Sequence, residues 1–374
     1  MAPHLGVFTN YLKTKIMSQL STFVDCPQIQ ASLLEAWNYN NLGHDGAVGL
    51  KFILDPINRD GFLQGKINHK ANGLRDVQVV YDQRFLESDV SASGVISCTA
   101  GGVDGETSTT YELDPTVGGS FSLKVTPAEL RARCQRNPDY IRHEIKKMMD
   151  AIIEKADTDF LTTLPLNTGN FADDVDNGLA PGTTSVVVTT TKDASGTIVP
   201  DAYQDVRFHF SNNRFSGVPY GFGTKIWNDY ALAQKAACCS QLGLDVKTYA
   251  QQNTFGFSFS HKMAGILGNA NEAIFIAPGS VQMLKFNEFE GPDGSIDHFN
   301  NGGVVVQDVL TYPDAGLPLT FDYRAEYVCE GLTRFWLISL AIAYKFIYLP
   351  TDMFQVGDRL EGVNGVNEFR ITNP

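Results

Sequence analysis

Few side chains that could do chemistry stand at the spacing that a known reaction or metal site requires. The seven histidines include no pair at the four-residue spacing of helical zinc ligands. His143 is followed by Glu144, but the second histidine of the H-E-x-x-H zinc motif is missing. We therefore expect no histidine to bind a metal or act in catalysis, and we place His143 on the solvent side of a helix.

A glycine-rich run near the middle of the chain does not fit a nucleotide-binding loop. Gly221, Gly223 and Lys225 fail the GxxxxGK[ST] spacing, and the third glycine of a dinucleotide fingerprint is replaced by Ile226. No GxSxG segment, which would mark a serine nucleophile, is present. We expect these glycines to shape a loop.

Acidic and cysteine clusters are equally incomplete. Asp173, Asp174 and Asp176 resemble part of a calcium loop, but the alternating ligands and the distal glutamate are missing. The six cysteines contain no Cys-x-x-Cys pair, and we expect them to be buried thiols in a reducing compartment. The sequence therefore predicts no catalytic residue, no metal and no cofactor.

Composition narrows the class of protein further. The chain has 374 residues, of which 43% are hydrophobic and 19% charged, and this excludes a disordered chain. The net charge is -13, so the overall basic excess of a sequence-specific DNA-binding protein is missing, although a protein that encloses DNA is not excluded. The longest apolar run, 335–343, is shorter than the ~20 residues of a membrane-spanning helix, and we expect no membrane contact.

The N-terminal third predicts extended structure with little core of its own. Residues 1–60 carry scattered apolar side chains, and 61–125 contain short β-rich runs separated by Gly-Gly and Asp-Gly pairs. The runs are 77–81, 95–98, 107–113 and 120–125, with the pair at 118–119 expected in a turn. Such a β-ribbon must either be floppy or lie on another surface.

A long helix is the clearest element. Thr126 and Glu129 form a capping box around Pro127, and a second helix start follows at Pro138. Apolar residues then recur at three- and four-residue spacing up to Pro165, which predicts a helix over 138–163, roughly 39 Å long. Its polar face is expected to carry His143, Glu144, Lys146, Lys147, Asp150 and Glu154.

The rest of the chain predicts a mixed domain followed by long strands. We expect a hairpin between 186–188 and 197–199, a helix over 228–242, and a strand over 274–277. A short helix is expected from Pro278 to Phe286. Strands are expected over 304–310, over 321–327 with one polar face, and over 335–348, where apolar residues on both faces indicate a central strand.

A polar run in the ribbon has two interpretations. Arg84, Glu87 and Asp89, with Ser88, could form a solvated face or could pair with charges of a neighbouring chain. Arg75 and Lys66 stand nearby. We keep Lys66, Arg75, Arg84, Glu87 and Asp89 as candidate inter-subunit contacts.

The order of these parts resembles the Hong Kong 97-type major capsid protein of tailed double-stranded-DNA bacteriophages, an α+β fold. The resemblance covers most of the chain and includes the strand–Pro-Gly–helix segment 274–286 and the paired strands 319–328 and 335–349. It implies an N-terminal arm (1–60), an extended β-ribbon loop (61–125) and a peripheral domain with a spine helix (126–200). It also implies a mostly axial domain (201–310) and C-terminal strands that return to the peripheral domain (311–374).

The resemblance implies a structural subunit and no enzyme. Such subunits assemble as hexamers and pentamers into an icosahedral virion shell, which forms in the host cytoplasm and encloses double-stranded DNA without sequence-specific contact. Portal and scaffolding proteins would be partners, with any scaffold a separate protein because no long charged helical leader is present. Three alternatives stay open: an encapsulin-like nanocompartment shell, another virion component such as a tail or decoration protein, and a β-rich enzyme or carbohydrate-binding module.

Overall fold

The computed structural model contains two compact units, which are described separately here. Unit 1 comprises 1–47, 113–156 and 285–345, and unit 2 comprises 48–112, 157–284 and 346–374. The structure describes residues 47–54, 67–69, 76–82, 106–112, 116–129, 140–169, 185–189, 202–213, 215, 217–227, 256–269, 271–289, 300–301, 305–312, 317–330, 333–349 and 364–372. Among them, no helix is long and apolar enough to cross a membrane.

Unit 1 is built on a sheet of long strands. Its order is β10 (Asn300–Asn301), β11 (Val305–Thr311), β12 (Thr320–Glu330), β13 (Thr333–Tyr348) and β4 (Gly118–Val125), with each neighbouring pair antiparallel. A sixth strand, β9 (Val281–Phe286), also pairs with β13. The three strands expected over 304–348 are confirmed, and β13 is the central strand that its apolar sequence predicted.

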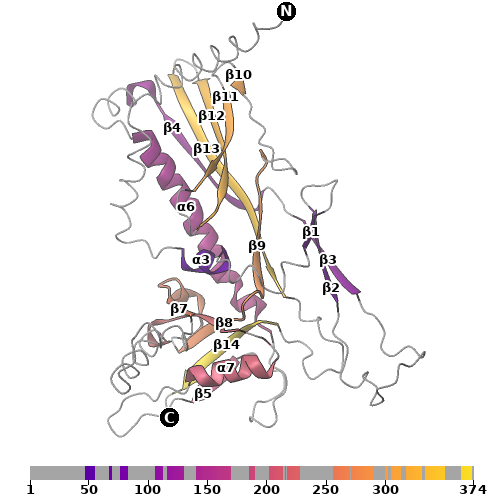
Figure 1. Cartoon of the computed structure of the whole chain (residues 1–374). Coiled ribbons are helices and arrows are strands. Elements are labelled where there is room, and N and C mark those ends of the chain that lie inside the picture. Colours follow the sequence, from indigo (N-terminus) through magenta and orange to yellow (C-terminus); the bar gives the residue numbers. More distant parts are fainter. Residues whose placement is uncertain are drawn as a thin grey trace, which may run out of the picture. The chain divides into compact units, whose positions relative to one another are not determined.

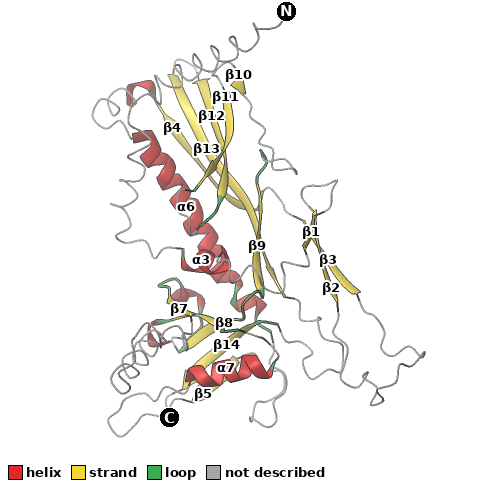
Figure 2. Ribbon diagram, in the orientation of Figure 1, coloured by secondary structure: helices red, strands yellow, loops and turns green. Residues whose placement is uncertain are grey.

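Helix α6 (Tyr140–Thr163) confirms the predicted long helix and lies along this sheet beside β4 (Figures 1 and 2). Its buried residues recur at helical spacing: Met148, Met149, Ile152, Ile153, Ala156, Phe160 and Leu161. Lys146, expected on the polar face, is instead only 6% exposed, because its ammonium pairs with Asp150 at 2.9 Å. After Leu164 the chain continues as a 3₁₀ turn, η3 (Pro165–Asn167).

The predicted capping box forms as expected before α6. The amide of Glu129 donates to Thr126 Oγ1 at 3.3 Å, and the amide of Thr126 donates to Glu129 Oε2 at 3.1 Å. Two backbone donors that a helix start would leave unpaired are thereby satisfied.

Strand β4 was predicted, but its partner was not. Assigned to the ribbon on the sequence, it pairs with β13 from Val125↔Trp336 to Gly118↔Ala343. Gly118 lies in the strand rather than in the expected turn, paired with Ala343. A Cβ at this position would overlap the backbone oxygen of Ile342, so the close pairing requires glycine. Gly119 has a similar role, since its Cβ would lie 2.6 Å from Ile152 of α6.

Unit 2 contains a mixed five-stranded sheet in the order β5 (Ser185–Thr189), β14 (Val366–Thr372), β8 (Glu272–Ile276), β6 (Tyr220–Gly223) and β7 (Gly256–Phe259). Its two outer pairs, β5–β14 and β6–β7, are parallel, and the inner pairs are antiparallel. Helix α7 (Ala202–Asn212) lies beside β5 (Figure 2). The fully buried aromatic core comprises Phe160, Phe210, Phe222, Trp227, Phe275 and Phe369.

Unit 2 also contains two short helices, α3 (Val48–Leu54) and α10 (Met263–Ile266). Helix α3 was not expected within the N-terminal arm. The predicted strand 186–188 is confirmed as β5, but it pairs in parallel with β14. The expected partner 197–199 and the expected helix 228–242 lie outside the described residues.

The expected helix from Pro278 to Phe286 is wrong. Ala277–Ser280 is a tight turn in which Gly279 has φ 77° and the amide of Ser280 donates to the oxygen of Ala277 at 3.1 Å. Proline followed by glycine at positive φ is typical of a type II turn. The chain then continues as β9, which pairs with β13.

The predicted ribbon forms a separate three-stranded antiparallel sheet of β1 (Ile67–His69), β2 (Asp76–Asp82) and β3 (Glu106–Glu112). The expected strands 77–81 and 107–113 are confirmed, and 95–98 lies outside the described residues. Among the described strands, β1–β3 pair only with one another. One cysteine contradicts the expectation of burial, because Cys329 is exposed near the end of β12.

Candidate functional site

The structure does not test the predicted contact residues. Lys66, Arg75, Arg84, Glu87 and Asp89 lie outside the described residues, so their role in subunit contacts stays a prediction.

The glycines that resembled a phosphate loop have a packing role instead. Gly221 and Gly223 lie in β6, where a Cβ would press on the rings of Phe275 and Phe257. They shape a strand rather than the expected loop. His143 is half-buried on α6, and in the described part of the chain no three His, Cys, Asp or Glu residues stand together as metal ligands.

The face of the unit 1 sheet opposite α6 is the surface we examine as a functional site. Gly119 lies against Ile152 of α6, so its strand neighbours Gly118, Ser120, Ser122 and Lys124 belong to the other face. Their cross-strand partners on β13 are Ala343, Ala341, Ser339 and Leu337. Side chains along the middle of this face are therefore small.

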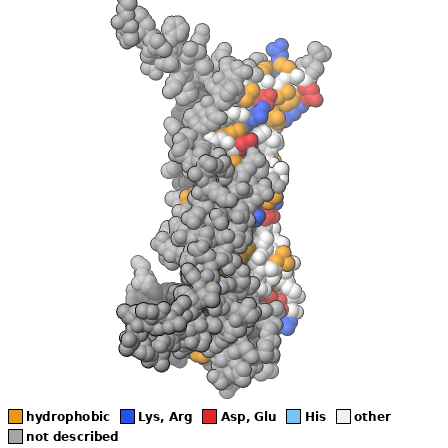
Figure 3. All heavy atoms as spheres, turned by 90° about the vertical axis from the view of Figure 1, so that its right-hand side faces the viewer, with side chains coloured by type: hydrophobic (Ala, Val, Ile, Leu, Met, Phe, Trp, Pro, Cys, Tyr) orange, Lys and Arg blue, Asp and Glu red, His pale blue; other side chains and the backbone are white. Residues whose placement is uncertain are grey.

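Polar contacts hold this face in a defined arrangement. The hydroxyls of Ser122 and Ser339 are 2.8 Å apart across the two strands. Lys124 lies over the ring of Phe335, with its ammonium 3.7 Å from the ring centroid and 3.7 Å from Glu330. In the side view of Figure 3, hydrophobic, basic and acidic side chains of the described residues are interspersed. The described residues in this view therefore carry charges of both signs and do not form a patch of one sign.

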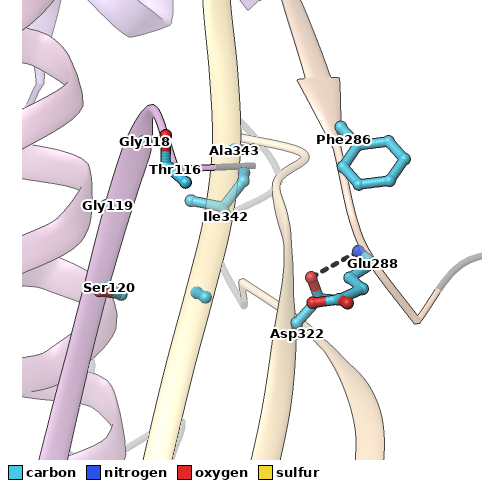
Figure 4. Close-up of a pocket in the computed structure, with 10 residues that line it drawn as sticks. Thr116, Gly118, Gly119, Ser120, Phe286, Glu288, Asp322, Ile342 and Ala343 are labelled. Carbon is cyan, nitrogen blue, oxygen red and sulfur yellow. Dashed lines mark hydrogen bonds between the residues drawn. The ribbon is translucent and has the colours of Figure 1, made fainter. Parts of the chain in front are cut away.

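A shallow pocket of about 90 Å³ lies on the same face (Figure 4). Its lining includes Gly118, Ser120, Glu288, Asp322 and Ala341. Enzyme pockets for small molecules are several times larger, and no nucleophile with an adjacent base lines this one.

Asp322 is a buried carboxylate that fixes one rim of this pocket. Its two oxygens accept the backbone N–H groups of Glu288 at 2.7 Å and Phe289 at 3.1 Å, the first of which is drawn in Figure 4. Asp322 was read from the sequence as part of the polar face of its strand. The burial of Asp322 could not be predicted, because the alternation of polar and apolar residues shows which face of a strand is polar but not which residues cover that face.

A second buried carboxylate, Asp157 of α6, organises unit 2 in the same way. Its Oδ1 accepts the backbone N–H groups of Gly49 at 2.9 Å and Leu50 at 3.2 Å, at the start of α3. Its Oδ2 lies 3.1 Å from the ammonium of Lys262, just before α10. Side-chain exposures of 3% for Asp157 and 13% for Lys262 make this a buried ion pair that links three helices.

Helix α3 has only seven residues, and burial of Leu50, Ile53 and Leu54 returns about 1.5 to 3 kcal/mol each. A helix this short gains little from its own hydrogen bonds. The contacts of Asp157 therefore add to the burial of these side chains in keeping α3 docked.

A third charged group lies across β8 and β14. Glu272 is buried, accepts the amide of Asn269 at 3.0 Å, and lies 3.6 Å from Arg370. Burial raises the pKa of the neighbouring Glu368, and the negative charge of Glu272 raises it further, while Arg370 lowers it. The charge of Arg370 thus offsets part of the repulsion between these two carboxylates.

Comparison with known proteins gives matches in structure alone. No protein-family model and no curated protein matches the chain. Solved phage capsid structures match it over most of its length. The match to a chain of the cyanophage A-1(L) capsid covers 88% of this chain and 94% of that chain, at 10% identity and a TM-score of 0.49. The match to a chain of the capsid of Ralstonia phage GP4 covers 81% of this chain and 85% of that chain, at 9% identity and a TM-score of 0.41. The match to a chain of the head of Helicobacter pylori bacteriophage KHP40 covers 81% of this chain and 86% of that chain, at 9% identity and a TM-score of 0.37.

Proposed function

We propose that this chain is the major capsid protein of a tailed bacteriophage, a structural subunit without enzymatic activity. Hexamers and pentamers of the chain would close into an icosahedral shell around double-stranded DNA. The encapsulin-like shell is one competing interpretation and another virion component is a second; the experiment below separates the capsid from the encapsulin-like shell.

The observation that carries the proposal is the order and pairing of the elements. A three-stranded ribbon that pairs with no other described strand is followed by β4, which pairs with β13, and then by the 24-residue helix α6. The long strands β11–β13 form the rest of that sheet, and a second sheet holds β5–β8 and β14. An isolated three-stranded ribbon has little core of its own and gains stability when it packs on another chain.

The surface chemistry supports a container rather than a nucleic-acid reader. Tight DNA binding requires basic side chains that displace counterions from the phosphates. A net charge of -13 disfavours such binding. The packaged DNA would then be enclosed without sequence-specific contact. Portal and scaffolding proteins would act during assembly in the host cytoplasm, and the finished shell would be the site of the protein in the virion.

The test is the assembly state of the purified full chain. Light scattering and negative-stain images of the same sample are expected to show closed shells or rings of hexamer size. Absorbance at 260 nm of particles recovered from infected or induced cells is expected to reveal nucleic acid. Shells filled with protein cargo instead would favour the nanocompartment, and a chain that stays monomeric under crowding and at all salt concentrations would overturn both.

A further inference from the structure

Residues 47–54 combine backbone strain with a buried charged contact. Ala47 has φ 46°, and it is the one non-glycine residue at positive φ in the described part of the chain. A side chain disfavours this conformation, which persists only where the surroundings hold it. The next residues begin α3, and their N–H groups are those that Asp157 accepts.

The contacts around Asp157 leave little room for adjustment. A Cβ on Gly49 would lie 2.5 Å from Cδ1 of Phe160, so the backbone of α3 rests directly on α6. Phe52 stacks on Tyr220 with ring centroids 4.5 Å apart. One carboxylate and these ring contacts therefore hold the start of α3, and Lys262 balances the charge of the carboxylate.

We propose that residues 47–54 are a latch, a two-state conformational device closed by Asp157 and Lys262 and opposed by the strained backbone of Ala47. Closed, the latch fixes α3 to α6. Open, it releases α3 while the five-stranded sheet stays folded. This inference concerns the isolated chain and does not depend on the proposed function.

The strained backbone of Ala47 favours the open latch, whereas the contacts of Asp157 and Lys262 favour the closed one. These opposite effects make the latch a switch. Helix α3 has seven residues and three large buried aliphatic side chains, so loss of the contacts at Asp157 is expected to shift the equilibrium toward the open state. Loss of one partner from a buried ion pair is far more costly than loss of an exposed pair, because the remaining charge stays unpaired. Opening is thus expected to respond strongly to Asp157 and weakly to surface charges.

Hydrogen exchange on the purified, unassembled chain tests the latch. In Asp157→Ala, amides of 48–54 are expected to exchange about 100-fold faster or more, while peptides from β8 and β14 keep their protection. Asp157→Asn keeps one acceptor and is expected to give an intermediate increase of about 10-fold. Asp322→Ala is the matched control, because Asp322 also accepts two successive backbone N–H groups but does so in unit 1. It should leave the exchange of 48–54 unchanged.

Ala47→Gly provides the opposite test. Glycine adopts positive φ without a steric penalty, so the closed latch should gain stability and 48–54 should exchange several-fold more slowly. Unchanged exchange of 48–54 in Asp157→Ala, with the sheet still protected, would overturn the latch. So would faster exchange in Ala47→Gly. Should Asp157→Ala fail to fold, Asp157→Asn and Ala47→Gly decide the question by the same readout.

Discussion

The two larger sheets of this chain bury their strands in different ways. In the five-stranded sheet of unit 2, every residue of β8 is buried, and Phe275 packs between Trp227 and Phe369. In the six-stranded sheet of unit 1, one face packs on α6 while the other carries small and charged side chains such as Ser122 and Lys124. Among the described residues, the first sheet is a buried core, and the second has one face of small and charged side chains.

The largest expected effect is in the buried core. Phe275→Ala should lower the free energy of unfolding by about 3 to 5 kcal/mol, because it removes a fully buried ring with neighbours at 5.2 and 5.4 Å. Leu337→Ala, on the face of β13 opposite α6, should cost less than about 1.5 kcal/mol. Urea unfolding followed by tryptophan fluorescence measures both. Equal losses would mean that the second face is as closed as the first.

A smaller effect is expected where two backbones approach in the long sheet. Gly118→Ala should cost about 1 to 3 kcal/mol, because the new Cβ overlaps the backbone of Ile342, which cannot move as a side chain can. Ser120→Ala, two residues along on the same face, is exposed and should change stability by less than about 0.5 kcal/mol. Thermal unfolding of both variants checks this, and a neutral Gly118→Ala would show that the β4–β13 pairing can separate at this end.

The helix-facing side of the long sheet should respond to alkaline pH. Burial raises the pKa of Tyr323 to about 12, and the negative charge of Asp308 adds to the shift. Because the folded chain holds this proton more tightly than the unfolded chain, stability should fall as pH rises from 10 to 12. By pH 11.5 the loss should be about 1 to 2 kcal/mol. Tyr323→Phe should lose less stability over that range. Urea titrations of the unmodified chain and of Tyr323→Phe at pH 8 and pH 11.5 measure these losses. Equal losses of stability in the two chains would mean that Tyr323 is not the source.

The smallest effect on stability is expected on the second face itself. Ser122→Ala removes one exposed hydroxyl pair, and it should change the free energy of unfolding by no more than about 0.5 kcal/mol. If this face contacts another chain, a bulky charged residue in the same place should block assembly without unfolding the subunit. Ser122→Glu, compared with Ser122→Ala by light scattering and circular dichroism, separates contact from folding. Normal assembly of Ser122→Glu would remove this face from the contact surface.

The sequence predicted the elements better than their partners. Helix α6 and strands β11–β13 were recognised because periodicity is local and extends over many residues. The partners of β4 and β5 were missed, since pairing depends on residues about 180 to 220 positions away. Pro278-Gly279 was read as a helix start because the same dipeptide suits a turn and a first helical turn, and only the φ of Gly279 separates them.

The buried polar groups were beyond sequence reasoning for a related reason. Asp157 lies within the predicted helix, but nothing local indicates that α3 and Lys262 meet it there. Cys329 is the opposite case, since a residue type that is usually buried is exposed in a strand. Burial of a given side chain depends on the complete fold, and the sequence alone gives only the average burial of each residue type.

The pairing of β4 with β13 also has a consequence for the time course of synthesis. Ser122 must wait for Ser339, 217 residues later, before the two strands can meet. At about 5 to 20 residues per second, a ribosome needs about 10 to 40 s to make that stretch. Until then β4 has no β13 to pair with, and β5 likewise waits for β14. A nascent chain therefore cannot complete either large sheet before its last strands emerge, so the finished surfaces become available only on a finished molecule.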